Sequence, residues 1–325
     1  MTEISSSTAL DRPTAAWLAH QRALGREYGN EERVLDSLRR SIVRHRAADL
    51  DHVGFDLWCD TLRHLDANTR RARQRIVRKF CLYRQRTQPT CFVPNPLYFA
   101  RPHPGRSPII VEPEQAARML AATAGLIPTA SSPLLPAVMR LAIVILYTAG
   151  LRRGELLRLT LDDVEPRAGV LRIRSSKFHK SRLVPLSRDA GDELRAYLRK
   201  RLMPSLDAGP HAPLLCNTRG GLRGYTGTGL SAGIHRLFKT TGVQNSEGRR
   251  PRIHDLRHSF AVQALVRWYR EGADVQSNLP KLAMYMGHVS IVSTAYYLHF
   301  VPALAALAGD RFEKSFGDLI EETPA

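Results

Sequence analysis

Cationic and imidazole side chains recur in five short segments between residues 148 and 300, and their types suit phosphate chemistry. The segments read TAGLRRGELLRLTLDDV (148–164), SSKFHKSRLVPL (175–186), HDLRHSFAV (254–262), MGH (286–288) and TAYYLHF (294–300). They supply Arg152, Lys177, His254, Arg257, His288 and a tyrosine pair. Arginine offers a planar fork of donors to two phosphate oxygens, while His and Lys can move protons. Such a set could stabilise a phosphate that gains negative charge in its transition state.

Several motifs of other phosphate-processing enzymes are missing from the sequence, and their absence excludes some reaction classes. No cluster of Asp and Glu is placed to hold two metal ions, so metal-assisted hydrolysis is not expected. His254 and His258 lie one helical turn apart, but no third metal ligand follows at a fitting spacing. No G-x-x-x-x-G-K-[ST] phosphate loop is present, so ATP use is not expected. We therefore expect no metal and no cofactor, and a protein nucleophile for which tyrosine is a candidate.

In order and spacing, the five segments resemble the motifs of the tyrosine recombinase (phage integrase) family, which includes Cre-like and Xer-like enzymes. AGLRRGEL resembles the box of the first catalytic arginine, and KFHKSRLVPL resembles the K-x-x-K-x-R-x-V-P-L hairpin that carries the lysine. HDLRHSFA matches H-x-L-R-H-x-F-A, and MGH stands in place of L-G-H. The family's nucleophilic tyrosine follows that histidine by nine residues, which selects Tyr297 in YYLH.

The resemblance implies a site-specific DNA recombinase with six catalytic residues: Arg152, Lys177, His254, Arg257, His288 and Tyr297. Tyr297 would attack a scissile phosphate, form a 3′-phosphotyrosine and release a 5′-hydroxyl; a partner strand's 5′-hydroxyl would then reverse the step. Both arginines and His288 would stabilise the transition state. Lys177 would protonate the leaving oxygen, and His254 would assist proton movement. Integration, excision, resolution and transposition all remain open, as do a type IB topoisomerase-like enzyme and a non-catalytic DNA-binding regulator of the same fold.

The tyrosine pair cannot be resolved by helical spacing. Ile291, Ala295 and Leu298 form an apolar stripe, and both Tyr296 and Tyr297 lie off it. Only the family register selects Tyr297, which leaves Tyr296 as a packing or supporting residue.

Two further assignments depend on neighbouring side chains. Lys180 lies in the same hairpin as Lys177 and is the alternative general acid. Glu155 follows Arg152 by one helical turn, so we expect it to support that arginine rather than to catalyse.

A mainly helical catalytic domain with a small antiparallel β-sheet must position these residues. Apolar spacing predicts helices over 113–126, 133–150 and 189–202. Alternation and turn residues predict three short strands over 162–165, 169–175 and 181–187. Residues 217–229 are expected to form a loop before a helical remainder. The most apolar run, 141–150, is too short to cross a bilayer.

A proline-rich stretch divides the chain, with five prolines between Pro94 and Pro108. We expect an N-terminal helical domain over 1–94, a linker over 95–108, the catalytic domain over 109–300 and a C-terminal tail over 301–325. Four helices are expected before the linker, at 14–29, 31–47, 53–65 and 68–86, with Asp51 and Asn68 as N-caps. The resemblance implies a SAM-like core-binding fold for this domain.

The charge balance favours an anionic partner, since the formal net charge is +18. The predicted helix 68–86 carries a basic face suited to tracking phosphates: Arg70, Arg71, Arg73, Arg75, Arg78, Lys79, Arg84 and Arg86. Double-stranded DNA is therefore the expected partner, and a membrane is not. The four cysteines form no C-x-x-C pair and the first residues contain no apolar signal segment. We expect a cytoplasmic, nucleoid-associated bacterial protein with free thiols.

The resemblance also implies a homo-oligomer, with two protomers on each DNA site and a tetramer at synapsis. Each protomer would clamp the duplex with its two domains. Accessory DNA-bending or partner recombinase proteins are left open. In the tail, apolar residues recur at helical spacing: Leu304, Leu307, Ala308 and Phe312. Such a helix needs a groove, either on a neighbouring protomer or on its own domain.

Truncation after Phe300 tests where the tail binds. If the tail docks on a neighbour, a truncated monomer should bind a single half-site almost normally, because the DNA-facing residues remain. Cooperative binding of a second protomer and strand exchange should both be lost. Gel-shift titrations on half-sites and full sites measure the difference. Cooperative assembly of the truncated protein on a full site would show that the tail belongs to its own chain.

Overall fold

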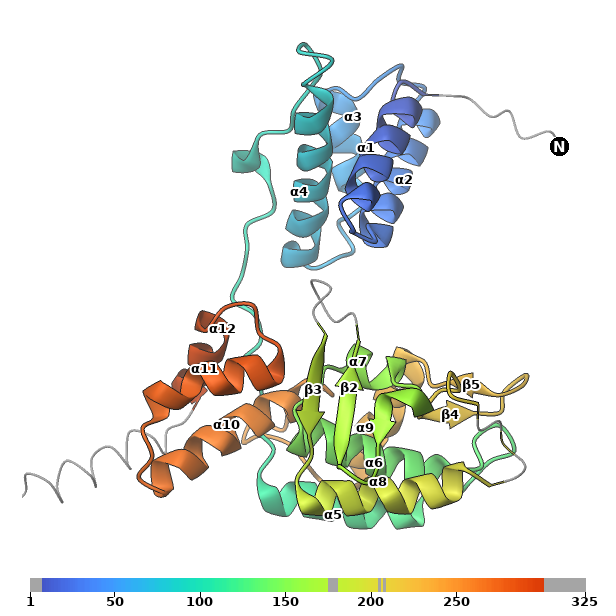
Figure 1. Ribbon diagram of the computed structural model, residues 1–325. Coiled ribbons are helices and arrows are strands. Elements are labelled where there is room, and N and C mark those ends of the chain that lie inside the picture. Colours follow the sequence, from blue (N-terminus) through green and yellow to red (C-terminus); the bar gives the residue numbers. More distant parts are fainter. Residues whose placement is uncertain (1–7, 175–180, 204–205, 207–208, 301–325) are drawn as a thin grey trace, which may run out of the picture. The chain divides into compact units, whose positions relative to one another are not determined.

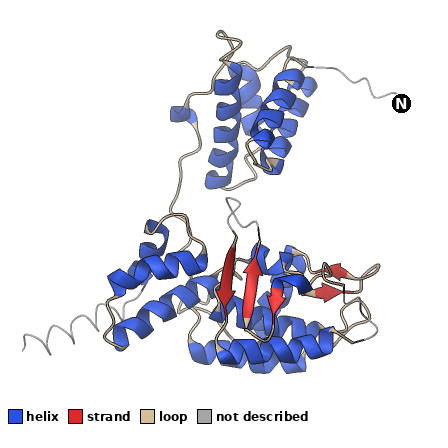
Figure 2. Cartoon of the chain, in the orientation of Figure 1, coloured by secondary structure: helices blue, strands red, loops and turns tan. Residues whose placement is uncertain are grey.

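The computed structural model describes residues 8–174, 181–203, 206 and 209–300. The chain divides into two compact units, Met1–Arg106 and Ser107–Ala325, each with its own hydrophobic core (Figure 1). Helices dominate both units, and the described strands belong to the second (Figure 2). The prediction of a mainly α fold with a small antiparallel sheet is confirmed.

The described part of the first unit is a bundle of four α-helices: α1 (Asp11–Ala23), α2 (Gly29–Arg44), α3 (His52–Asp60) and α4 (Ala67–Arg84). Each contributes an apolar side to a common core. Leu38, Trp58 and Phe80 are completely buried there. The rings of Trp17 and Phe80 pack with their centroids 5.8 Å apart.

The N-caps of α3 and α4 decide where these helices begin. The Asp51 carboxylate accepts from the Gly54 N–H at 2.7 Å, so the predicted cap of α3 is confirmed. The prediction of Asn68 as the cap of α4 is wrong. Asp66 caps that helix by accepting from the Thr69 N–H at 3.0 Å, and Asn68 lies inside it. Either residue type can cap a helix, but α4 begins at Ala67, directly after Asp66.

The predicted basic face of α4 needs one correction at Arg84. This side chain is only 4% exposed and pairs with Asp49, its Nη1 donating to Asp49 Oδ1 at 2.6 Å. The partner is remote in sequence, so a search for acidic neighbours one helical turn away cannot find it. Arg84 therefore stabilises the first unit. Arg75 and Lys79 are exposed along the same helix, and Arg86 is exposed just after it ends.

The proline-rich segment begins as part of the first unit. Phe99 follows the short 3₁₀ turn η1 (Pro96–Tyr98) and is buried in the first core. Arg71 Nη1 donates to the carbonyl oxygen of Ala100 at 3.2 Å, and Arg78 Nη1 to that of Pro94 at 2.5 Å. The boundary between the units falls between Arg106 and Ser107, near the end of the expected linker.

The described part of the second unit contains the helices α5 (Pro113–Ala122), α6 (Leu135–Thr148), α7 (Arg153–Arg158), α8 (Arg188–Arg201), α9 (Gly227–Thr240), α10 (Asp255–Arg270), α11 (Val275–Met286) and α12 (Val292–Ala295). Of these, α6 is buried along most of its length and packs against α5, α7, α8, α9 and α10, while α11 packs on α10 in a separate hydrophobic cluster that includes Tyr297. Short 3₁₀ turns are η2 (Thr123–Gly125), η3 (Leu161–Asp163) and η4 (Tyr296–Phe300). Among the described residues, none of these helices combines the length and apolar character that a membrane span requires.

A three-stranded antiparallel sheet lies in the order β1 (Val164–Glu165), β2 (Val170–Ile173) and β3 (Arg182–Pro185), as predicted. Leu171 pairs with Val184, and both are completely buried. Ile173 pairs with Arg182, the first residue of β3. This register places Arg182 opposite the buried Ile173. From this position its side chain can reach other elements of the unit.

A second sheet was missed within the predicted loop 217–229. β4 (Cys216–Asn217) pairs with β5 (Arg223–Gly224) across a turn in which Gly220 and Gly221 have positive φ. Strands of two residues are too short to show alternation. The end of the predicted loop is already helical, because the Thr226 side chain accepts from the Gly229 N–H and starts α9.

Candidate active site

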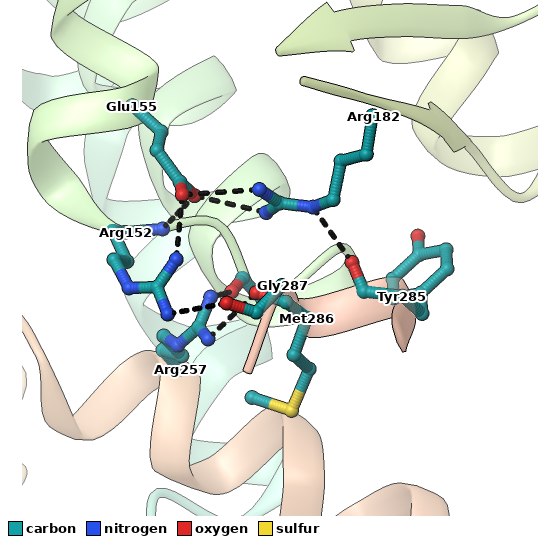
Figure 3. Close-up of polar contacts among 8 residues, drawn as sticks. Arg152, Glu155, Arg182, Arg257, Tyr285, Met286 and Gly287 are labelled. Carbon is teal, nitrogen blue, oxygen red and sulfur yellow. Dashed lines mark hydrogen bonds and ion pairs between the residues drawn. The ribbon is translucent and has the colours of Figure 1, made fainter. Parts of the chain in front are cut away.

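Three arginines converge on the C-terminal end of α11 (Figure 3). Each donates to one of three consecutive backbone carbonyls: Arg182 Nε to Tyr285 (2.9 Å), Arg257 Nη2 to Met286 (2.8 Å) and Arg152 Nη2 to Gly287 (2.8 Å). The last carbonyls of a helix have no partner within it and lie at the negative end of its dipole. Cationic donors are favoured at such an end, so the end of α11 organises the guanidinium groups.

Gly287 makes this arrangement sterically feasible. It ends α11 in the left-handed region with φ 70°, which favours glycine. A Cβ at this position would lie 2.7 Å from Arg182 Nη1. The glycine of the MGH motif therefore leaves room for the guanidinium group.

Arg152 stands immediately before α7 and is held by the first turn of that helix. Its backbone N–H donates to Glu155 Oε2 at 2.9 Å, and its Nη1 donates to Glu155 Oε1 at 2.7 Å. A carboxylate at the third helical position is well placed to accept from the N-cap backbone. The R-x-x-E spacing thus fixes the arginine, whose side chain remains 24% exposed.

The Glu155 carboxylate is the buried anion of the site. Its side chain is 1% exposed and accepts from Arg152 and, in a bidentate pair, from Arg182. Burial alone would raise the pKa of Glu155, but hydrogen bonds and charge from the two arginines outweigh it and lower the pKa to about 2. Glu155 is therefore ionised across the neutral range and supports Arg152, as expected from its spacing.

Arg257 is the most deeply buried arginine of the site, at 1% exposure. Its Nη1 donates to the carbonyl oxygen of Gly150, and its Nη2 donates to that of Met286. Burial and the nearby charge of Arg152 lower its pKa to about 10, which still leaves it protonated at neutral pH. The site thus joins the end of α6, the first turn of α10 and the end of α11.

Tyr297 lies beside this cluster and is 3% exposed. Its ring stacks against His288 with centroids 6.1 Å apart and meets His258 edge-on at 5.4 Å. Burial raises the pKa of Tyr297, and interaction with the Arg257 guanidinium opposes that rise. Of the two tyrosines, Tyr297 is therefore the one that the structure brings to the arginines.

Tyr296 is 45% exposed, so it is not a core packing residue, but its ring meets that of Tyr297 edge-on at 6.1 Å, which is compatible with the supporting role that was also expected. The expected apolar stripe is wrong in part, because Ile291 is 50% exposed while Thr294 and Tyr297 are buried. The physical reason is that this segment is not one regular helix. It changes from α12 to the 3₁₀ turn η4 at Tyr296, so a constant helical period does not apply.

His288 follows Gly287 and is oriented by a hydrogen bond. Its Nδ1 lies 2.7 Å from the Thr294 hydroxyl oxygen. Burial, followed by the charges of Arg257 and Arg152, lowers the pKa of His288 to about 4. The imidazole is therefore neutral at pH 7 and can interact with a phosphate as a hydrogen-bonding group.

His254 and His258 form the edge of the site on α10. Their ring centroids are 4.8 Å apart, and His258 lies between His254 and Tyr297. Burial and the neighbouring His254 lower the pKa of His258 to about 4. Among the described residues, no group of three or more His, Cys, Asp or Glu side chains is arranged to hold a metal ion.

Five of the six predicted site residues are thus gathered in the second unit: Arg152, His254, Arg257, His288 and Tyr297. Lys177 and its alternative Lys180 lie outside the described residues. Sequence reasoning did not assign Arg182 to the site. The signal was available, because Arg182 occupies the arginine position of the hairpin motif that aligned the lysine.

Comparison with known proteins identifies the family of these motifs. The family model of the phage integrase family matches residues 110–302. "Putative integrase/recombinase y4rE" of Sinorhizobium fredii is 34% identical over 249 residues, covering 75% of this chain and 77% of that protein. Tyrosine recombinase XerD of Ralstonia nicotianae is 29% identical over 312 residues, covering 92% and 94%.

Solved structures share the fold at lower identity. An integrase of the transposon Tn1549, in complex with a circular intermediate DNA, is 19% identical with a TM-score of 0.63, covering 90% of this chain and 95% of that one. The XerH site-specific recombinase bound to a palindromic difH substrate is 20% identical with a TM-score of 0.58, covering 81% and 73%.

Replacing Glu155 by Gln should reveal its charge in the pH dependence of stability. Because the folded-state pKa is lowered from 4.5 to about 2, the contribution is complete above about pH 4.5 and is lost as pH falls toward 2. A shift of this size corresponds to about 3 kcal/mol. Urea titrations should show wild type exceeding E155Q in free energy of unfolding near pH 7, with the difference shrinking below pH 4.5.

Glu193 provides the matched control, since it pairs bidentately with Arg140 but is 29% exposed. Near pH 7 the E193Q difference should be smaller than the E155Q difference, because solvent screens the more exposed pair. An E155Q difference that stays constant between pH 7 and pH 3 would contradict the assigned ionisation of Glu155.

Proposed function

The chain belongs to the phage integrase family and is a tyrosine recombinase, and we propose that Tyr297 is the nucleophile with which it breaks and rejoins duplex DNA. The observation that carries this proposal is the placement of Tyr297 against His288 and Arg257, while Tyr296 is exposed. A tyrosine hydroxyl beside a guanidinium group and a neutral imidazole is suited to attack on a phosphodiester.

The proposed reaction divides the work among the remaining site residues. Tyr297 attacks the scissile phosphate and forms a 3′-phosphotyrosine, which conserves the bond energy without an external energy source. Arg152 and Arg257 stabilise the negative charge that develops on the phosphate oxygens. His288 donates a hydrogen bond to the same phosphate from Nε2, since Nδ1 faces Thr294.

Proton transfer completes the cycle. Lys177 protonates the leaving 5′-oxygen, and His254 assists proton movement at the nucleophile. A 5′-hydroxyl from a partner strand then attacks the phosphotyrosine and releases Tyr297. The chemistry requires no metal or cofactor, because the arginines supply the positive charge. Recombination is favoured over topoisomerase and regulator alternatives by relatives described as recombinases and integrases along most of the chain.

The buried state of Tyr297 implies a rearrangement before cleavage. Arg257 is 1% and Tyr297 3% exposed, so neighbouring side chains have to move before a phosphate can reach the guanidinium group. The two carbonyl groups that bind Arg257, those of Gly150 and Met286, do not need to move during this rearrangement. We infer that DNA binding displaces Tyr297 while the arginines stay on their carbonyls.

Duplex DNA is the proposed partner. The net charge of +18 supports it, as do exposed basic residues on α4 such as Arg75 and Lys79. The transposon Tn1549 integrase, which shares the fold, is described in complex with a circular intermediate DNA, and XerH is described as bound to its palindromic difH substrate. Such a substrate fits a protein that works in the bacterial cytoplasm at the nucleoid.

We further propose two protomers on each DNA site and a tetramer at synapsis, because strand exchange needs four cleaved strands. The tail, residues 301–325, is the proposed link between protomers. Accessory DNA-bending proteins or a partner recombinase could set the direction of the reaction, and the basic chemistry is the same with or without them.

Replacing Tyr297 by Phe tests the nucleophile. The substitution removes the hydroxyl but keeps the ring that packs against His288, so DNA binding should be unchanged. A nicked duplex that traps the covalent intermediate should give no adduct with Y297F. The matched control is Y296F, which should form the adduct at the wild-type rate. An adduct with Y297F that disappears with Y296F would show that the nucleophile is Tyr296.

A further inference from the structure

Arg182 is the arginine of the site to which the proposed reaction gives no role. Its side chain is 12% exposed and crosses from β3 toward α7 and α11 (Figure 3). Nη1 and Nη2 donate to the two oxygens of Glu155 at 3.1 and 3.0 Å, and Nε donates to the carbonyl oxygen of Tyr285 at 2.9 Å. All three of its nitrogens therefore face protein acceptors.

The arrangement around Glu155 links Arg182 to a residue that meets the substrate. One carboxylate accepts from Arg182 on one side and from the backbone and side chain of Arg152 on the other. A buried carboxylate that loses one partner is under-neutralised, and its geometry relaxes. The orientation of the Arg152 guanidinium thus depends on Arg182 through the shared anion.

The second link runs through the end of α11. Arg182 donates to the first of the three consecutive carbonyl oxygens, and Arg257 and Arg152 donate to the next two. The Tyr285 hydroxyl in turn donates to the Pro185 carbonyl oxygen at 2.9 Å, at the other end of β3. β3 is therefore fastened at both of its ends to the segment that leads into His288.

We propose that Arg182 is a positioning residue of the recombination reaction, which orients Arg152 through Glu155 and holds the turn before His288 through the Tyr285 carbonyl. The inference rests on the proposed function, because it assigns Arg152 to the scissile phosphate. Arg182 itself makes no contact with the DNA in this account. Lysine cannot replace it, since a single ammonium group cannot form the bidentate pair and reach the carbonyl together.

The primary test compares R182K with R140K in the full-length protein. Arg140 makes a bidentate pair with Glu193 on α6 and α8 and is not part of the site. Single-turnover adduct formation on the nicked duplex should slow by about 100-fold in R182K, the cost of a misplacement of about 1 Å. DNA affinity should stay within about threefold, because the phosphate contacts remain. R140K should match wild type in both measurements.

A double-substitution cycle tests the route through Glu155. If Arg182 acts through that carboxylate, the cleavage rate of R182K/E155Q should be close to that of the slower single variant. Rate losses that multiply would overturn this route. R182Q provides a second variant if R182K fails to melt cooperatively, and the same split between cleavage and binding is expected of it.

A substrate with sulfur in place of the bridging 5′-oxygen distinguishes a defect at the non-bridging oxygens, where Arg152 acts, from a defect in protonation of the leaving group. A thiolate leaves without prior protonation, so it should not restore R182K if the defect lies at the non-bridging oxygens. Restoration to the wild-type rate would place the effect of Arg182 at the leaving atom and overturn the inference. Parallel losses of cleavage and DNA affinity would also overturn it, because they indicate a DNA contact.

The controls distinguish this inference from the proposed function. Absence of an adduct with wild-type protein would overturn the proposed function and the role of Arg182 with it. A wild-type adduct accompanied by an equally fast R182K adduct would overturn the inference alone. Slow cleavage with normal binding, unrestored by sulfur, supports both.

Discussion

Three guanidinium groups on three consecutive carbonyls hold the site of this recombinase together. Arg182, Arg257 and Arg152 come from β3, α10 and the start of α7, and they meet at the end of α11. The helix dipole and the unpaired terminal carbonyls favour the positive charges there. His288 follows directly, so its position depends on the same turn. Most of the site's geometry follows from this one helix end.

The site's charge is carried by groups whose protonation is stable. The Glu155 carboxylate pairs with Arg152 and Arg182, while Arg257 is held by carbonyl oxygens, so these three arginines leave an excess of positive charge for a phosphate. His288 and His258 are instead neutral at pH 7, because burial and nearby positive charge lower their pKa values to about 4. Neutral imidazoles among charged arginines provide hydrogen bonds and proton transfer without adding to the electrostatic repulsion.

The motifs in the sequence predicted five residues that the structure brings together, because each motif couples a side chain to a local turn. Arg152 with Glu155 and Gly287 with His288 are examples. The motifs left Arg182 unassigned, however, and Lys177 lies outside the described residues. Helical spacing could not decide between Tyr296 and Tyr297, since the chain changes from α-helix to 3₁₀ helix at that point. Only the family register selected the tyrosine that lies against the arginines.

Long-range pairing explains most of what the sequence did not reveal. Arg84 looked like part of a basic surface, but it is neutralised by Asp49 from a distant segment. Arg182 looked like a hairpin residue, but its partners lie on α7 and α11. The β4–β5 hairpin is too short to show a period. The partners of Arg84 and Arg182 are tertiary contacts that local spacing does not reveal, whereas the β4–β5 pairing is local but extends over only two residues on each strand.

The central claim is that the carbonyl-held arginines act on the transition state rather than merely binding DNA. The most direct measurement is the cleavage rate and the DNA affinity of Arg152→Ala and Arg257→Ala on the same nicked duplex. Each substitution should slow adduct formation by roughly two to three orders of magnitude, as for other donors to a developing oxyanion. Affinity should fall far less, because many phosphate contacts remain. Equal losses in cleavage and affinity would contradict the claim and make these arginines DNA-binding residues only.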